Sequence, residues 1–75
     1  MEDKIQEYLE NIYNFKIKVE FKDFRQYEIK GKIDPDLNFN LVVLYDVTLT
    51  LEANIILMVR KIDNEIIQLF KKAYN

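Results

Sequence analysis

Apolar and polar residues alternate through most of the middle of this chain, and this pattern restricts the possible folds more than any other feature. The first apolar series is Phe15, Ile17, Val19 and Phe21, with lysine or glutamate between its members. Side chains of a strand point alternately to the two faces of its sheet, so the pattern predicts a half-buried strand over about residues 15–22. The alternation stops at Asp23 and then resumes, which predicts a hairpin and a second strand over about 25–33.

A third alternating series is too long for a single strand of this sheet. Every odd position from Leu37 to Leu51 is apolar. Fifteen residues of strand would extend about 50 Å, whereas the two preceding strands reach about 26 to 30 Å. We therefore expect a third strand over about 37–48, with a possible bulge near Asp46.

Gly31 lies on the apolar side of the second predicted strand, where every neighbour of the same parity has a side chain. A glycine within a strand marks either a bulge or a place where a large neighbour needs room. If a large neighbour is the reason, it would be Phe15 or Phe39. The sequence leaves open whether Gly31 marks a bulge or such a close approach.

Helical periodicity flanks the strands on both sides. Apolar residues spaced three and four apart predict a helix over about 3–14, with Asp3 and Gln6 as a capping pair. The same spacing predicts a second helix over about 51–74, with Thr50 as its N-cap.

These elements define a single α+β domain over residues 1–75, in the order α-β-β-β-α. The strands should form a three-stranded antiparallel meander with both helices packed on one face. A chain of 75 residues is near the lower limit for one hydrophobic core, and without cysteine it has no disulfide to support that core. We therefore expect a homodimer.

The composition removes several kinds of chemistry. The chain has no His, Cys, Ser or Trp, which excludes Ser or Cys nucleophiles with a His base and metal sites built on thiolate or imidazole. With a single glycine it has no Gly-rich loop to bind phosphate. We expect no catalytic residues and no cofactor, and so a protein that is not an enzyme.

Four oxygen-bearing side chains alternate after the second strand: Asp34, Asp36, Asn38 and Asn40. A calcium loop has the same alternation, but it needs Gly at its sixth position and Glu at its twelfth, where this chain has Phe39 and Tyr45. Pro35 favours a turn at this point. We interpret the segment as a turn followed by a strand and expect no metal site.

No part of the sequence predicts a targeting or membrane-spanning segment. The longest purely apolar run, at positions 55–59, is far shorter than the roughly 18 residues that cross a bilayer. We expect an intracellular, cytoplasmic protein that does not bind membranes.

The order of the elements resembles that of the double-stranded RNA-binding domain. That family contacts phosphates with lysines at the start of its second helix and with a Gly-Pro-x-His-type loop between its first two strands. Here the helix begins LEAN at Leu51 and the loop is KDFR from Lys22, so both sets of contacts are missing. A nucleic-acid site would instead use the basic residues of the hairpin, which are Lys16, Lys18, Lys22, Arg25, Lys30 and Lys32.

Several apolar residues have positions that the core does not explain. Val42 and Leu44 have the parity of the outer sheet face, and an apolar centre with a polar rim is typical of an interface. Scattered exposed apolar residues are also normal, so this pattern has an ordinary alternative. The candidate interface residues are Phe24, Val42, Leu44, Leu57 and Met58.

The leading hypothesis is therefore a non-catalytic, self-associating module that binds a partner protein by occupying its surface. A small, acidic, cofactor-free chain of this kind is similar to many phage-encoded inhibitors, including anti-CRISPR proteins. The alternative is nucleic-acid binding by the hairpin lysines, although the net charge of −2 lacks the basic excess common in such proteins.

Overall fold

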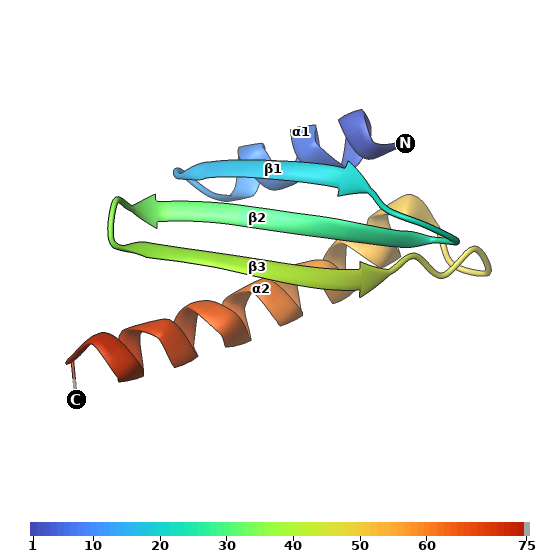
Figure 1. Cartoon of the computed structure of the whole chain (residues 1–75). Helices are drawn as coiled ribbons and strands as arrows, with labels where there is room; N and C mark the ends of the chain where they lie inside the picture. Colours follow the sequence, from blue (N-terminus) through green and yellow to red (C-terminus); the bar gives the residue numbers. More distant parts are fainter. Residues whose placement is uncertain (75) are drawn as a thin grey trace.

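The computed structural model describes residues 1–74 and has the predicted element order and fold class (Figure 1). Its elements are α1 (Glu2–Ile12), β1 (Lys16–Phe21), β2 (Gln26–Asp34), β3 (Leu37–Leu44) and α2 (Leu51–Tyr74). The strands form one antiparallel sheet in the order β1-β2-β3, with both helices behind it (Figure 1).

The core lies between the sheet and the two helices. Alternate strand residues point into it, as the period of two predicts. The buried apolar residues are Ile5 and Leu9 of α1, Ile17, Val19, Tyr27, Ile29, Phe39 and Val43 of the sheet, and Ile55, Met58 and Ile62 of α2. Because both helices cover the same face, the other face of the sheet is left open.

Gly31 makes room for an aromatic ring. It lies opposite Phe39 in the β2–β3 register, and a Cβ atom at Gly31 would overlap the Phe39 ring. The ring of Phe15 packs edge-on against the same ring, with centroids 6.0 Å apart. Of the two alternatives for Gly31, the close approach of a large neighbour is the one the structure shows.

The third strand is shorter than the sequence pattern suggested. It ends at Leu44 and not near residue 48, and the sheet irregularity lies between Lys32 and Asp34 and not near Asp46. The partner strand ends at this point, because β2 begins at Gln26, opposite Leu44, and Phe24 and Arg25 before it form a turn. Beyond Leu44, the side-chain amide of Asn54 of α2 hydrogen-bonds both the N–H and the C=O of Asp46.

The start of α2 follows the sequence, and the start of α1 does not. Thr50 caps α2, because its hydroxyl accepts a hydrogen bond from the Ala53 N–H at 3.1 Å. The expected capping pair of Asp3 and Gln6 is wrong, since Met1 is the N-cap of α1 and makes no side-chain capping bond. Gln6 instead turns toward the sheet.

Two side chains of α1 cover the outer edge of β1. The Gln6 carbonyl accepts a hydrogen bond from the Val19 N–H at 3.0 Å, and the Glu2 carboxylate accepts one from the Phe21 N–H at 2.6 Å. An edge strand otherwise leaves such groups available to another chain. The edge of β1 is thus partly blocked from within the molecule.

Candidate binding surfaces

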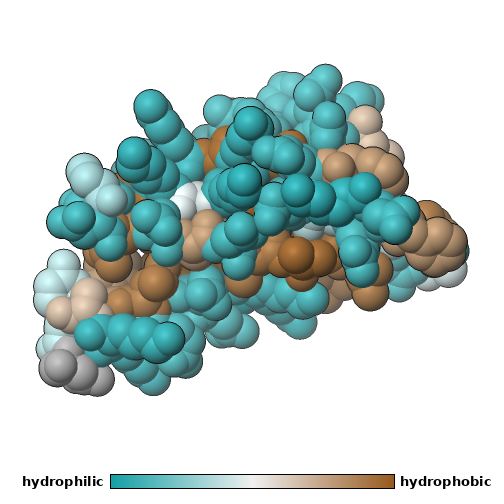
Figure 2. Space-filling model, in the orientation of Figure 1, coloured by the Kyte–Doolittle hydropathy of each residue, from teal (hydrophilic) through white to brown (hydrophobic). Residues whose placement is uncertain are grey.

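The open face of the sheet is divided into a charged part and an apolar part. Its side chains form cross-strand rows: Lys16, Lys32 and Asn38; then Lys18, Lys30 and Asn40; then Glu20, Glu28 and Val42. Gln26 and Leu44 follow at the far end of β3. Figure 2 shows this face, with hydrophilic side chains over β1 and β2 and hydrophobic surface along the β3 side.

Glu20 and Glu28 neutralise part of the basic charge on this face. Lys22 lies 3.1 Å from Glu28 and 3.7 Å from Glu20, while Lys30 and Lys18 lie 3.6 and 3.4 Å from the nearer of the two acids. The hydrogen bond from Lys22, followed by one from Asn40, holds the pKa of Glu28 below its usual value. Lys22 is therefore occupied in an ion-pair network and is not a free cation.

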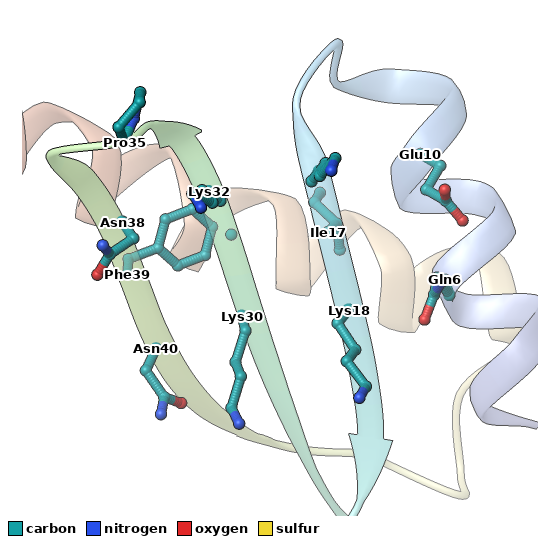
Figure 3. Close-up of a pocket in the computed structure, with 12 residues that line it drawn as sticks. Gln6, Glu10, Ile17, Lys18, Lys30, Lys32, Pro35, Asn38, Phe39 and Asn40 are labelled. Atoms are coloured by element: carbon teal, nitrogen blue, oxygen red, sulfur yellow. The ribbon is translucent and has the colours of Figure 1, made fainter.

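Four of the six basic candidates gather around one hollow (Figure 3). Lys16 lies opposite Lys32 and Lys18 opposite Lys30, and the hollow beside them has a volume of about 680 Å³. Like charges directly opposite each other on neighbouring strands are unfavourable, and a bound anion would relieve that repulsion. Among residues 1–74, neither Lys16 nor Lys32 forms an ion pair.

Arg25 is not part of this group, because it lies at the tip of the β1–β2 hairpin. Phe24 and Arg25 both adopt the left-handed region, with φ of 43° and 68°, and the guanidinium lies 5.3 Å from the centre of the Phe24 ring. Residues with a side chain rarely adopt this conformation. It leaves Phe24 76% exposed at the end of the molecule.

The apolar candidates separate into surface and core. Val42 is 56% exposed and Leu44 is 64% exposed, as their parity predicted, and Leu57 is 43% exposed. Met58 is 2% exposed and packs in the core, so it is not part of an exposed patch. Helix periodicity alone could not place Met58 inside, because the apolar run around it occupies every face of the helix.

The outer edge of β3 is open, in contrast to that of β1. The Tyr45 N–H donates to the Arg25 carbonyl at 2.8 Å, so odd-numbered residues at this end of the β2–β3 ladder direct their backbone groups to β2. In an antiparallel pair the alternate residues direct theirs away. The N–H and C=O groups of Asn38, Asn40, Val42 and Leu44 therefore point out of the sheet.

A groove runs along this edge between β3 and α2. It has a volume of about 280 Å³ and is lined by Val43, Leu44, Leu57, Met58, Arg60 and Lys61. Leu44 and Leu57, which the sequence proposed as separate candidates, thus line one groove. Arg60 and Lys61 were not predicted, because on their own they are ordinary exposed charges of a helix.

Within residues 1–74, no group of three or more Asp or Glu side chains is placed to hold a metal ion. The Asp34 carboxylate accepts a hydrogen bond from the Asp36 N–H at 3.2 Å, which is the turn expected there. No helix in this part of the chain is long and apolar enough to cross a membrane.

Comparison with protein-family models, with curated proteins and with solved structures found no match for this chain.

Proposed function

We propose that this chain is a non-catalytic protein-binding module that occupies the surface of a partner protein. We call its binding region the β3 surface and define it by Val42, Leu44 and Leu57 together with the groove between β3 and α2. The observation that carries the proposal is the exposure of Val42 and Leu44 beside an open strand edge. Exposed apolar patches mark interaction sites, and an open strand edge can bind an extended segment of a partner.

The sequence of β3 supports the same proposal. Proteins protect edge strands with lysine, proline, inward charges or a covering segment. The edge of β1 has such cover from Glu2 and Gln6, whereas the eight residues of β3 include no charge and no proline. An unprotected edge favours aggregation unless something binds it, which favours a binding role for β3.

The test is capture of partners from the native host with wild-type protein and with the variant that combines Val42→Asp and Leu44→Asp. We expect the variant to lose the partner that wild type retains, because two hydrated carboxylates would replace the apolar contact surface and would have to lose water on binding. Lys18→Glu with Lys30→Glu is the matched control on the same sheet face and should retain it. An unchanged set of partners in the Val42 and Leu44 variant would refute the proposal.

Self-association remains part of this proposal. The end of α2 extends beyond the sheet (Figure 1), and Ile67 and Tyr74 on it are 50% and 75% exposed. In an antiparallel pair of such helices centred on Ile67, Asp63 of one copy would lie near Lys71 of the other. A second copy could thus complete both the apolar and the charged contacts.

A second candidate function is binding of nucleic acid at the lysine hollow. The observation in its favour is the cross-strand pairing of Lys16 with Lys32 and of Lys18 with Lys30, which concentrates positive charge on an otherwise acidic chain. Phosphate binding by such a group should weaken steeply as salt is added, whereas binding at the β3 surface should not. If Lys18→Glu with Lys30→Glu leaves retention of nucleic acid at low salt unaltered, this candidate is refuted.

A further inference from the structure

The outward backbone groups of β3 form a regular binding template. Asn38, Asn40, Val42 and Leu44 direct their N–H and C=O groups away from β2, and no side chain among residues 1–74 hydrogen-bonds them. The matching groups on β1 are different, since the N–H groups of Val19 and Phe21 already bond α1. Within residues 1–74, the edge of β3 is therefore the more open of the two, because the edge of β1 is partly covered by Glu2 and Gln6.

The helix below this edge turns the template into a groove. α2 passes behind β3 and continues beyond the sheet, so a strand added to β3 would lie over the helix (Figure 1). Side chains of an added strand alternate between its two faces. One set would lie beside Val42 and Leu44, and the other would enter the groove lined by Leu57 and Lys61.

We propose that an extended segment of a partner protein adds to β3 as a fourth strand. Alternate apolar side chains of the segment fill the groove, and an acidic side chain pairs with Arg60 and Lys61. This inference rests on the proposed function and specifies how the β3 surface binds. Backbone hydrogen bonds to the edge supply affinity, and the groove supplies specificity.

The charges at the groove favour an acidic segment. Arg60 and Lys61 are exposed and form no ion pair within residues 1–74, where the carboxylates that pair with lysines, Glu20 and Glu28, both lie on the sheet. β3 itself is uncharged, so it adds nothing that would repel an acid. Both groove residues are cations, so they attract a carboxylate of the bound segment.

The position of α2 favours an extended segment over a second copy of this chain as the occupant of the β3 edge. A second copy that paired along the whole of β3 about a two-fold axis would bring its own α2 under the same edge. That space is already taken by α2, which crosses there (Figure 1). An extended segment brings only a strand.

The parity of β3 provides a specific test. Proline at position 42 removes an N–H that points out of the sheet and leaves the bonds to β2 intact, and proline is tolerated on edge strands for this reason. Val42→Pro keeps the site apolar, and Val42→Ile is the matched control that keeps both the N–H and the apolar side chain. Circular dichroism and thermal unfolding establish that both variants fold.

The probe is a display library of random dodecapeptides selected on the wild-type protein. We expect the selected peptides to alternate apolar residues and to include Asp or Glu. Val42→Pro should weaken their binding by about tenfold or more, since one hydrogen bond is lost and the ring obstructs the added strand. Val42→Ile should bind as wild type does, and Arg60→Glu with Lys61→Glu should reverse the preference for acidic residues.

If Val42→Pro does not fold, strand addition is tested with chemically modified peptides and the wild-type protein. N-methylation of alternate amides in a selected peptide blocks one of its two hydrogen-bonding edges. Only one of the two N-methylated series should lose binding to the wild-type protein if the peptide is a strand. Equal loss or equal retention in both series would overturn the inference.

Other outcomes have equally definite meanings. Selection that yields no binder, or binders that Val42→Pro retains at wild-type affinity, overturns strand addition. A dimer in solution that Val42→Pro converts to monomer assigns the edge to a second copy and overturns it too. Strand addition can fail while Val42→Asp with Leu44→Asp still loses the captured partner, in which case the proposed function stands without it.

Discussion

The side-chain amide of Asn54, in the first turns of α2, hydrogen-bonds the backbone of Asp46 in both directions. Its oxygen accepts from the Asp46 N–H at 2.8 Å, and its nitrogen donates to the Asp46 carbonyl at 2.9 Å. The same nitrogen donates to the Thr50 carbonyl, also at 2.9 Å. Asn54 is 1% exposed, and it fixes the loop that carries the chain from the end of β3 to α2.

Replacing Asn54 with alanine should destabilise the fold. The change leaves the N–H and C=O of Asp46 without their partner, and we expect a loss of about 2 to 3 kcal/mol in the free energy of unfolding. Chemical denaturation followed by circular dichroism measures this loss. Asn64→Ala, at an exposed position of the same helix, is the control and should change stability by less than about 0.5 kcal/mol. Equal effects of the two substitutions would contradict the role of Asn54.

Acid should weaken the same loop through Asp46. Hydrogen bonds from the Thr48 hydroxyl and then from the Thr48 N–H hold the pKa of the Asp46 carboxyl below its ordinary value. A folded-state pKa below the unfolded one means that the contribution is complete above the unfolded pKa, about 4, and is lost as pH falls through the folded pKa. The pKa of Glu28 is lowered too and adds a loss of the same sign.

We therefore expect the melting temperature to fall as pH decreases below about 4, and to fall less in Thr48→Val. That variant keeps the Asp46 carboxylate but removes the hydroxyl donor. The measurement is thermal unfolding at a series of pH values. An identical acid dependence in wild type and Thr48→Val would show that the Thr48 hydroxyl does not stabilise the ionised carboxylate.

The sequence was sufficient for those parts of the fold that depend on local pattern. The alternation around Val19 predicted which side of β1 is buried, because side-chain direction in a strand follows parity alone. The same rule placed Val42 and Leu44 outside. Thr50 was identified as a cap for a similar reason, since a cap and its helix are neighbours in the chain.

The candidate site was predicted less completely, because it depends on contacts between distant segments. Leu44 and Leu57 lie thirteen positions apart in the chain and line one groove, on either side of the loop whose Asp46 is bonded by Asn54. Which backbone groups of β3 point outward depends on the β2–β3 register, which has an irregularity between Lys32 and Asp34. No sequence pattern indicated that Gln6 would bond β1 and not cap its own helix.

Gly31 should not tolerate a side chain while Phe39 is present. A methyl group there would overlap the Phe39 ring, and we expect Gly31→Ala to cost about 1 to 3 kcal/mol. Combining it with Phe39→Leu should recover part of this cost, so that the two substitutions are not additive. A double-mutant cycle by urea denaturation measures the coupling. Strict additivity would show that the contact between the two residues does not matter.

The chain should form a dimer through the end of α2. In light scattering we expect a mass of twice the 9.1 kDa chain, because the exposed apolar side chains there have no cover in a single copy. Ile67→Asp with Phe70→Asp should give the monomer mass, whereas Val42→Ile should leave the dimer intact. A monomer mass for wild type at all accessible concentrations would refute self-association.

Removing the cover from β1 should give the molecule a second open edge. In the combination of Glu2→Ala and Gln6→Ala, the N–H groups of Val19 and Phe21 lose the acceptors they bond in wild type. We expect a modest loss of stability, about 1 to 2 kcal/mol, because water replaces these acceptors at an exposed edge.

The more informative effect of this change is on association. An uncovered edge can pair with another chain, so the double variant should aggregate at concentrations where wild type does not. Glu2→Gln is the control, since its amide oxygen still accepts from Phe21 and it should behave as wild type does. Light scattering against concentration distinguishes the three proteins. If the double variant stays as dispersed as wild type, then α1 does not protect the edge of β1. In that case the difference between the β1 and β3 edges no longer supports binding at β3.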